Sequence, residues 1–181
     1  MIIALGHRQG VGKDTCAEIL RQKNGKRTQI LSFAHELKYH CWTLFGGLGL
    51  QTPEYYNENY DAKNQTLPLG KTPREIWIEY GYYMRKISPD IWIHKVMGKM
   101  TQENYLYVIT DLRYPNEFNT IHDLGGICVR IDRDNALVSE DVADIALQSY
   151  PNSEWDMVID NNGNLDDLAT KVSPIAHWSG Y

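Results

Sequence analysis

The chain has 181 residues, of which 43% are hydrophobic and 23% charged, and its formal net charge is −5 at pH 7. This composition is typical of a globular protein and argues against disordered, collagen-like and fibrous chains. The acidic balance disfavours a broad nucleic-acid-binding face, so a few focused basic residues would have to hold any anionic ligand. No apolar run approaches the ~20 residues that a membrane helix needs. Three widely spaced cysteines among apolar neighbours indicate buried thiols in a reducing cytoplasm.

Short apolar runs alternate along the chain with amphipathic segments, a pattern typical of an α/β domain with a mostly parallel sheet. Strands are expected at residues 2–5, 29–33, 105–110, 126–131 and 157–159. Helices are expected at residues 14–23, 35–45, 115–124, 140–149 and 165–172. Two more begin at Thr72-Pro73-Arg74-Glu75, which has the pattern of a capping box, and at Ser88-Pro89-Asp90, running to about residue 100.

The chain length suggests a single domain, residues 1–181, with two segments that stand apart. Residues 51–71 are polar and rich in Tyr and Asn, and we expect a surface flap there. Residues 132–156, between two strands, carry one short amphipathic helix with Val142, Ile145 and Ala146 as its apolar side. So few apolar contacts are expected of a mobile lid, although a permanently docked helix would also fit.

The most informative motif is GHRQGVGKDT, residues 6–15, which follows a strand and opens a helix. In this context Gly10 and Gly12 would let backbone N–H groups converge on phosphate oxygens, and the helix N-terminus would add a favourable dipole. Lys13 would reach the β- and γ-phosphates as a point charge. The motif predicts a nucleoside triphosphate site without specifying a reaction, although a glycine-rich turn before an ordinary helix remains the alternative.

The motif departs from the phosphate-loop pattern GxxxxGK[ST] at two places. His7 stands where the first glycine belongs, with Gly6 one residue early, and Asp14 takes the usual Ser/Thr place, with Thr15 next. These departures leave the geometry of the loop open but not its assignment.

From GKDT at residues 12–15 onward, the chain resembles the phage-type deoxynucleoside monophosphate kinases. The motifs that carry the resemblance are SFA at 32–34 with Lys38, TPRE at 72–75 with Gly81, DIW at 90–92, VITDLR at 108–113 with Glu117, GG at 125–126, RIDR at 130–133 and IDNNG at 159–163. They span nearly the whole chain apart from residues 51–71. The resemblance implies a P-loop NTPase fold, a three-layer α/β/α arrangement around a five-stranded sheet, and phosphoryl transfer from ATP to a deoxynucleoside monophosphate with Mg²⁺.

Asp111 and Arg113 follow a predicted buried strand, at the edge of the sheet where ligand sites of α/β proteins form. Asp111 can hold Mg²⁺ directly or through water, or it can cap the helix that begins near Pro115. Arg113 suits bidentate phosphate contact, with a surface ion pair to Glu117 as the alternative.

Arg74 lies in the first turn of a predicted helix, where the dipole disfavours a cation and a bound anion would compensate. Gly81, in mid-helix, costs about 0.5–1 kcal/mol relative to Ala, which either a nearby ligand or a tight helix crossing would explain. Trp92 could pack beside a base or in the core. Lys38 could meet the acceptor phosphate or lie in solvent.

The resemblance assigns these residues to two substrates. The implied ATP-binding residues are Gly10, Gly12, Lys13, Asp14, Thr15, Arg133 and Asn161. The implied monophosphate-binding residues are Lys38, Arg74, Gly81, Trp92, Asp111, Arg113 and Glu117. Lys13, Arg74 and Arg113 would act on the transferring phosphoryl group, and Thr15 with Asp14 or Asp111 would hold Mg²⁺.

Other functions remain open at this point. Another small P-loop kinase, such as one acting on dephospho-coenzyme A, is the nearest alternative, and a non-catalytic nucleotide-binding switch is a different class. A guanine-reading NKxD motif is absent, and IDNNG follows the last predicted strand instead. The accepted base and the oligomeric state are not predicted, although many members of the family it resembles are homodimers. The resemblance implies a place in the cytoplasm (the host cytoplasm if the gene belongs to a phage).

Overall fold

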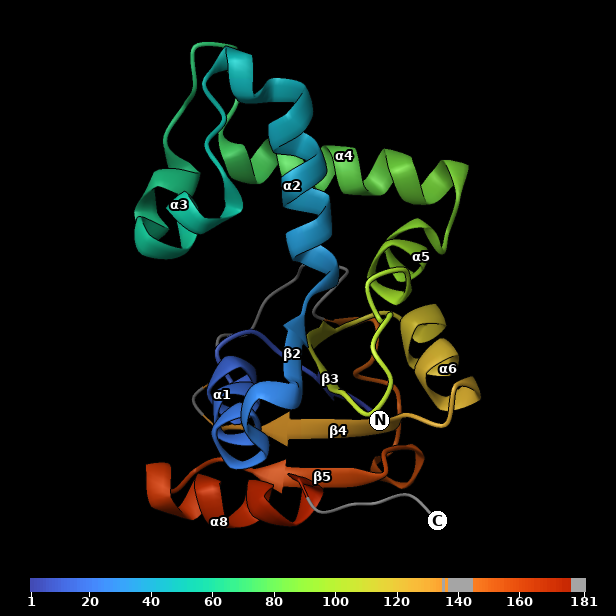
Figure 1. Ribbon diagram of the computed structural model, residues 1–181. Coiled ribbons are helices and arrows are strands. Elements are labelled where there is room, and N and C mark those ends of the chain that lie inside the picture. Colours follow the sequence, from blue (N-terminus) through green and yellow to red (C-terminus); the bar gives the residue numbers. More distant parts are fainter. Residues whose placement is uncertain (135, 137–144, 177–181) are drawn as a thin grey trace. The chain divides into compact units, whose positions relative to one another are not determined.

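The computed structural model describes residues 1–134, 136 and 145–176 (Figure 1). They group into two compact units: unit 1 combines Met1–Ser32 with the described residues from Met100 onward, and unit 2 is Phe33–Lys99. Among the helices that the structure describes, none has both the length and the apolar character that crossing a membrane would require.

Unit 1 is built on a five-stranded sheet. Its strands are β1 (Ile2–Gly6), β2 (Thr28–Leu31), β3 (Leu106–Leu112), β4 (Ile127–Asp132) and β5 (Met157–Asp160). They lie in the order β2-β3-β1-β4-β5, and all four pairings are parallel. The expected parallel sheet is therefore confirmed. Two predicted ends are wrong: Phe33 starts a helix instead of ending β2, and β3 continues two residues past the expected end, so that Asp111 lies within it.

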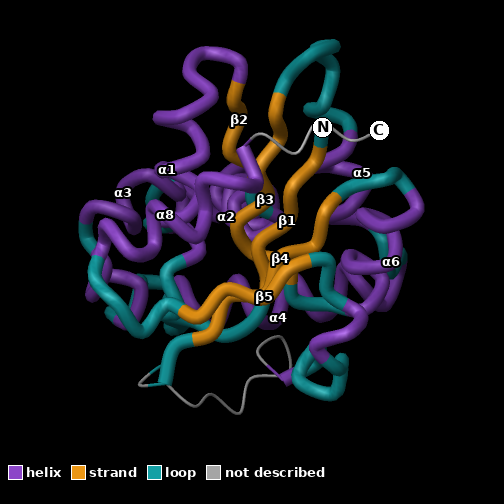
Figure 2. Tube along the Cα trace, turned by 90° about the horizontal axis from the view of Figure 1, so that it is seen from below, coloured by secondary structure: helices purple, strands orange, loops and turns teal. Residues whose placement is uncertain are grey.

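Helices cover both faces of this sheet, as the tube drawing shows (Figure 2). The helices of unit 1 are α1 (Lys13–Asn24), α6 (Pro115–Asp123) and α8 (Leu165–Ala176), with 3-10 turns at Gly25–Arg27 and Asn152–Glu154. Leu20 of α1 and Val172 of α8 share a core with Val129 of β4. On the other face, α6 packs on β4, where the Cys128 thiol contacts the carbonyl oxygen of Phe118. The predicted three-layer architecture is confirmed.

Unit 2 is helical. It contains α2 (Phe33–Phe45), α3 (Pro53–Glu58), α4 (Pro73–Ile87) and α5 (Ile91–Met97), with 3-10 turns at Gly46–Leu48 and Tyr60–Asn64. The capping box at the start of α4 is confirmed: Thr72 accepts a hydrogen bond from the Glu75 amide, and the Glu75 carboxylate accepts one from the Thr72 amide. The expected start of the next helix at Ser88 is wrong. The Ser88 amide still donates to Met84 as the C-cap of α4, so the new helix begins only at Ile91.

The polar segment at residues 51–71, expected to be a surface flap, belongs to unit 2 and contains the helix α3. Thr52 caps α3 by accepting a hydrogen bond from the Tyr55 amide. The ring of Tyr56 is buried and meets the Trp77 ring edge-on, with centroids 5.1 Å apart. An aromatic contact therefore anchors the segment to α4, which a pattern of polar residues does not predict.

Part of the predicted lid, residues 135 and 137–144 with Val142 among them, lies outside the described residues. Of its predicted apolar side, Ile145 is exposed and Ala146 half-buried. Leu147, which that pattern left out, is buried.

A tryptophan ring lies over the end of β1. A Cβ atom built on Gly6 would come 2.5 Å from Cη2 of Trp155 and 3.2 Å from the carbonyl oxygen of Leu112. Trp155 is itself buried and packs edge-on against Phe118. Gly6 is therefore needed for packing beneath this ring.

We predict that Gly6→Ala lowers the free energy of unfolding by roughly 1–3 kcal/mol, because a methyl group has no room under a buried ring. Gly47→Ala is the matched control, since a Cβ atom there meets nothing within 4 Å. Urea titrations of both variants measure the effect. Equal stabilities would mean that the Trp155 ring moves aside without cost.

Candidate active site

The loop between β1 and α1 turns through three residues with left-handed backbone. Their φ angles are +87° at His7, +79° at Gly10 and +102° at Gly12. Glycine adopts this conformation freely, whereas L side chains rarely do, with His among the more tolerant. His7 thus takes the backbone conformation that the first glycine of a phosphate loop would supply. This resolves the mismatch in the motif: Gly6 serves packing, and His7 occupies the glycine position.

The Lys13 side chain lies within the loop and binds two of its carbonyl oxygens. Its Nζ donates to the carbonyl oxygen of His7 at 3.1 Å and also to that of Arg8, and the residue is only 7% exposed. The ammonium group is therefore held within the loop, at the first residue of α1, which is where a phosphate-loop lysine belongs.

The N-terminus of α1 has no side-chain cap. Its N-cap residue is Gly12, which has no polar side chain, whereas α4 carries a complete capping box. The first turn of a helix leaves backbone N–H groups without intrahelical partners, and the dipole there favours an anion. This end of α1 has the properties of a phosphate-binding terminus.

Asn161, at the end of β5, supports the loop from the side. Its Nδ2 donates to the carbonyl oxygen of Val11 at 2.7 Å, and its backbone N–H donates to the backbone carbonyl oxygen of Asp132 at 2.8 Å. A Cβ atom at Gly12 would lie 2.4 Å from the same Nδ2. Asn161, expected at the ATP site, thus binds the phosphate loop itself and sets its position.

Asp111 lies near the carboxyl end of β3 and is 9% exposed. Ser32, which follows the neighbouring strand β2, donates from its hydroxyl to Oδ2 of Asp111 at 2.9 Å. Close by, the Glu117 carboxylate accepts hydrogen bonds from the backbone N–H groups of Arg113 and Tyr114 at 3.0 and 3.1 Å. Ser32 belonged to a motif of the resemblance, but its pairing with Asp111 depends on adjacent parallel strands and was not predicted.

The oxygen donors expected to hold a metal all belong to unit 1. Asp14 and Thr15 are exposed on the first turn of α1, and Asp111 is buried at the sheet edge. Carboxylate and hydroxyl oxygens are the ligand types that Mg²⁺ prefers, so the chemistry of the donor set fits this ion. Arg133, which follows β4, is exposed, and Arg113 is half-buried.

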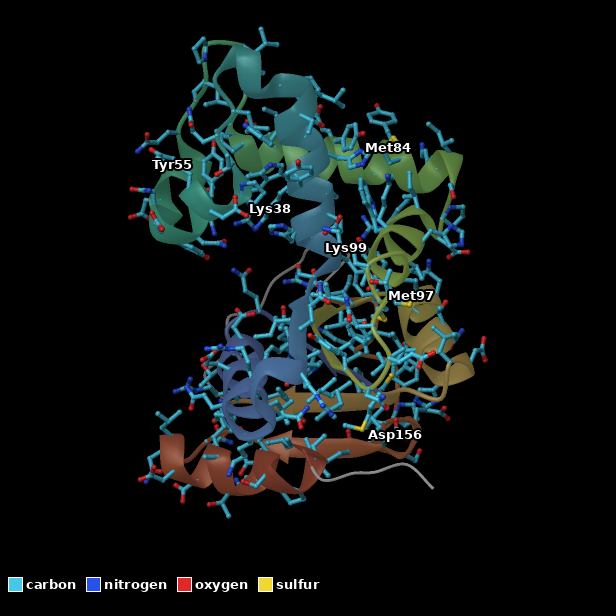
Figure 3. All side chains as sticks on the ribbon, in the orientation of Figure 1. Lys38, Tyr55, Met84, Met97, Lys99 and Asp156 are labelled. Carbon is cyan, nitrogen blue, oxygen red and sulfur yellow. The ribbon has the colours of Figure 1, made fainter. Side chains whose placement is uncertain are left out.

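A different group of side chains, of types that can bind a metal ion, lies near the start of β4. His122, Cys128 and Asp156 place their ligand atoms within 4.8 Å of one another; Asp156 is labelled in Figure 3. The Asp156 carboxylate already accepts a hydrogen bond from the Cys128 amide at 2.7 Å and lies 3.2 Å from His122 Nε2. Burial raises the pKa of the Cys128 thiol well above its ordinary value, so the thiol stays protonated. This contact ties β4 to the turn before β5.

Four of the predicted monophosphate-binding residues lie in unit 2. Arg74 is exposed in the first turn of α4, and Nζ of Lys38 on α2 lies 4.9 Å from the centroid of the Trp77 ring (Figure 3). A Cβ atom at Gly81 would come 2.5 Å from Leu37 Cδ1 of α2. The tight helix crossing therefore accounts for this glycine.

Trp92, the fourth of these residues, is 1% exposed. Its ring meets that of His40 edge-on at 5.9 Å and lies 6.1 Å from that of Tyr80. In this structure it packs in the core of unit 2, the second of the two roles that the sequence left open.

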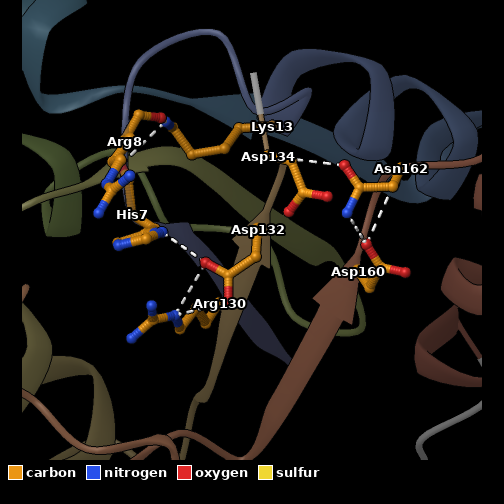
Figure 4. A network of polar contacts seen from close by, with 8 residues as sticks. All are labelled: His7, Arg8, Lys13, Arg130, Asp132, Asp134, Asp160 and Asn162. Atoms are coloured by element: carbon orange, nitrogen blue, oxygen red, sulfur yellow. Dashed lines mark hydrogen bonds and ion pairs between the residues drawn. The ribbon is translucent and has the colours of Figure 1, made fainter. Parts of the chain in front are cut away.

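His7 also takes part in a polar network at the end of β4 (Figure 4). Its Nδ1 lies 2.6 Å from Oδ1 of Asp132, a close contact that is not aligned as a hydrogen bond. Burial, then the positive charge of Arg130, lowers the pKa of His7, and Asp132 opposes this shift. The folded protein therefore favours neutral His7.

The comparisons with known proteins agree with this geometry. The family model described as deoxynucleotide monophosphate kinase matches residues 82–172, which is half of the chain. The chain belongs to the deoxynucleotide monophosphate kinase family. A relative from Acanthamoeba polyphaga mimivirus, described provisionally as a deoxynucleotide monophosphate kinase, is 26% identical and aligns over 95% of this chain and 94% of its own.

Solved structures of small kinases share the fold. The dephospho-CoA kinase of Campylobacter jejuni has a TM-score of 0.55 at 15% identity and covers 98% of this chain and 96% of its own. The shikimate kinase of Aquifex aeolicus has a TM-score of 0.50 at 14% identity, with 98% and 97% covered. At these identities the likeness concerns the fold, and it confirms the predicted P-loop kinase architecture of this kinase.

We predict a pH dependence of stability that comes from His7. Because its pKa in the folded protein lies below the ordinary value of about 6.5, the unfolded chain takes up a proton that the folded kinase resists. The stability from neutral His7 is complete above that pH and is lost as the pH falls below it.

Asn tolerates left-handed backbone and does not titrate in this range, so His7→Asn should remove this dependence. Urea titrations between about pH 7.5 and about pH 5.5 should show a steeper loss for the unmodified kinase than for His7→Asn. His94→Asn, at an exposed histidine of α5, serves as control. Parallel losses in the unmodified kinase and His7→Asn would contradict the prediction.

Proposed function

We propose that this kinase transfers the γ-phosphoryl group of ATP to a deoxynucleoside monophosphate and thereby produces a diphosphate for DNA precursor synthesis. The observation that carries the proposal is the buried Lys13 ammonium inside a left-handed loop that opens an uncapped helix. The membership of the deoxynucleotide monophosphate kinase family supports the choice of acceptor. Phosphoryl transfer needs positioning and charge neutralisation more than covalent chemistry, which suits a site made of a lysine, arginines and backbone donors.

On the ATP side, the loop amides around Gly10 and Gly12 and the N-terminus of α1 would bind the phosphate oxygens. Lys13 would exchange its carbonyl partners in the loop for the β- and γ-phosphates. Asn161 would act by holding the loop, and Arg133 would contact ATP from the end of β4.

On the acceptor side, Arg74 would bind the phosphate of the monophosphate, and its exposure in the first turn of α4 supports this role. Lys38 would contribute a second positive charge, and Gly81 and Trp92 would shape unit 2 around the acceptor. In unit 1, Arg113 would neutralise the transferring group, with Asp111 beside it and Glu117 fixing the turn that carries it. The acceptor phosphate oxygen is already a nucleophile, so no general base is required.

Thr15, Asp14 and Asp111 would hold Mg²⁺, which neutralises the charge of the phosphates when it is bound. The hydrogen bond from Ser32 keeps the Asp111 carboxylate oriented at the sheet edge. A second copy of the chain is a further expected partner, in line with the family resemblance.

One assay tests the proposal as a whole. Diphosphate formation from ATP and Mg²⁺ is measured for a panel of deoxynucleoside and ribonucleoside monophosphates, with dephospho-coenzyme A as the control acceptor. We expect turnover with at least one deoxynucleoside monophosphate. Turnover of dephospho-coenzyme A alone would replace the proposed substrate class, and ATP binding without transfer to any acceptor would indicate a nucleotide-binding switch.

We predict that Lys13→Ala lowers turnover on the order of 10²- to 10³-fold, because it removes a charge that follows the transferring phosphoryl group. Lys23→Ala, at the other end of the same helix, is the matched control and should retain turnover. Steady-state rates at saturating substrates measure both. Near-normal turnover of Lys13→Ala would refute the assignment of the phosphate loop.

We predict that Arg74→Ala raises KM for the monophosphate by roughly 10-fold or more, since it loses a charge-assisted contact to the acceptor phosphate. KM for ATP should change little. Titrating each nucleotide at a fixed level of the other separates the two effects, with Arg85→Ala on the same helix for comparison. Equal losses for both nucleotides would place the acceptor phosphate elsewhere.

A further inference from the structure

Strand β4 carries two charged residues on the face that its core residues do not occupy. Val129 and Ile131 belong to the core with α1 and α8, so Arg130 and Asp132 project from the opposite face. In the register of the sheet Arg130 pairs with Gly6, the last residue before the phosphate loop. The side chain of Arg130 therefore starts directly beside the loop.

Asp132 binds the guanidinium group of this arginine on its Nε side. Nε of Arg130 donates to Oδ1 and Oδ2 of Asp132 at 2.9 and 3.0 Å. Among the residues that the structure describes, Asp132 is the one partner of Arg130, and it binds Nε alone. The two terminal guanidinium nitrogens thus remain directed away from the carboxylate, in the fork geometry that matches phosphate.

Among the described residues, the charges that act on His7 are those of two arginines, Arg130 and Arg8, and of one carboxylate, Asp132. Figure 4 shows the ends of the His7, Arg130 and Arg8 side chains on the same side of the network. The His7 side chain is 4% exposed, and within the described part of the chain neither its Nε2 nor the buried Nε of Arg8 has a hydrogen-bond partner in well-aligned geometry. Buried polar atoms without partners are unfavourable, so a ligand that satisfies them is the natural complement.

From these contacts we infer that Arg130 is a further phosphate-binding residue, which Asp132 orients toward the phosphate chain of the triphosphate in the loop. The inference rests on the proposed function and adds a residue that the sequence motifs did not assign. Lys13 binds the carbonyl oxygens of His7 and Arg8, the residues whose side chains lie beside Arg130. Lys13 and Arg130 therefore lie at the same loop. This favours the triphosphate over the acceptor monophosphate as the ligand of Arg130.

The test measures binding without turnover. Dissociation constants of inorganic tripolyphosphate and of ATP are measured by calorimetry for the unmodified kinase, Arg130→Ala and Arg130→Lys. We expect Arg130→Ala to weaken both ligands by roughly 10- to 100-fold, as a charge-assisted contact to phosphate implies. Arg21→Ala, which removes the same charge from an exposed position on α1, should leave both constants unchanged.

Arg130→Lys distinguishes binding by an oriented guanidinium group from binding by positive charge alone. Lysine keeps the charge but cannot bind Asp132 through Nε while presenting two further donors, so we expect it to recover only a small part of the lost affinity. Full recovery would show that Arg130 acts as a diffuse charge and would overturn the inference. Arg130→Lys also keeps the test valid if the alanine variant does not fold, which unfolding curves of each variant will show.

The two proposals fail in different ways. If the unmodified kinase binds neither tripolyphosphate nor ATP, the proposed function falls, and this inference falls with it. If the unmodified kinase binds both and Arg130→Ala binds them equally well, the proposed function stands and the inference is overturned.

Discussion

The turn from β1 into α1 is the constraint on which the rest of unit 1 depends. Within six residues the chain leaves a buried strand and starts a helix, and three of these residues have left-handed backbone. Left-handed backbone is unfavourable for a histidine unless its surroundings hold it in place. Trp155 packs over Gly6 on one side, and Asn161 binds Val11 on the other. Both supports come from the last fifth of the chain, so the phosphate loop exists only in the folded unit.

At the carboxyl edge of the sheet, most of the site's polar groups bind partners that are close in space. Ser32 holds Asp111, Glu117 holds the turn at Arg113, and the loop carbonyls hold Lys13. A parallel sheet brings all strand ends to one edge, which is why residues so distant in sequence meet there. Such pairs keep charged side chains in fixed positions, which is the preorganisation that phosphoryl transfer would need under the proposed function.

Unit 2 is held together by close helix contacts and aromatic rings. Gly81 lets α2 approach α4, and the rings of Tyr56, Trp77 and Trp92 fill the spaces between helices. The capping box fixes the first turn of α4, and with it the position of Arg74 along the helix. The polar residues of the 51–71 segment obscure this aromatic core in the sequence, because only Tyr56 of its three tyrosines is buried.

The sequence by itself determined the five strands, the phosphate loop, the capping box of α4 and the place of Asp111 near a strand end. Each of these follows from a local pattern of apolar residues, glycines and caps, which a few neighbouring residues specify. Tertiary structure decided the rest: the conformation of His7, the contact of Asn161 with Val11 across 150 positions, and Gly81 beneath Leu37. Those contacts join residues far apart in the chain, and a local pattern carries no record of which distant side chain will occupy the neighbouring space.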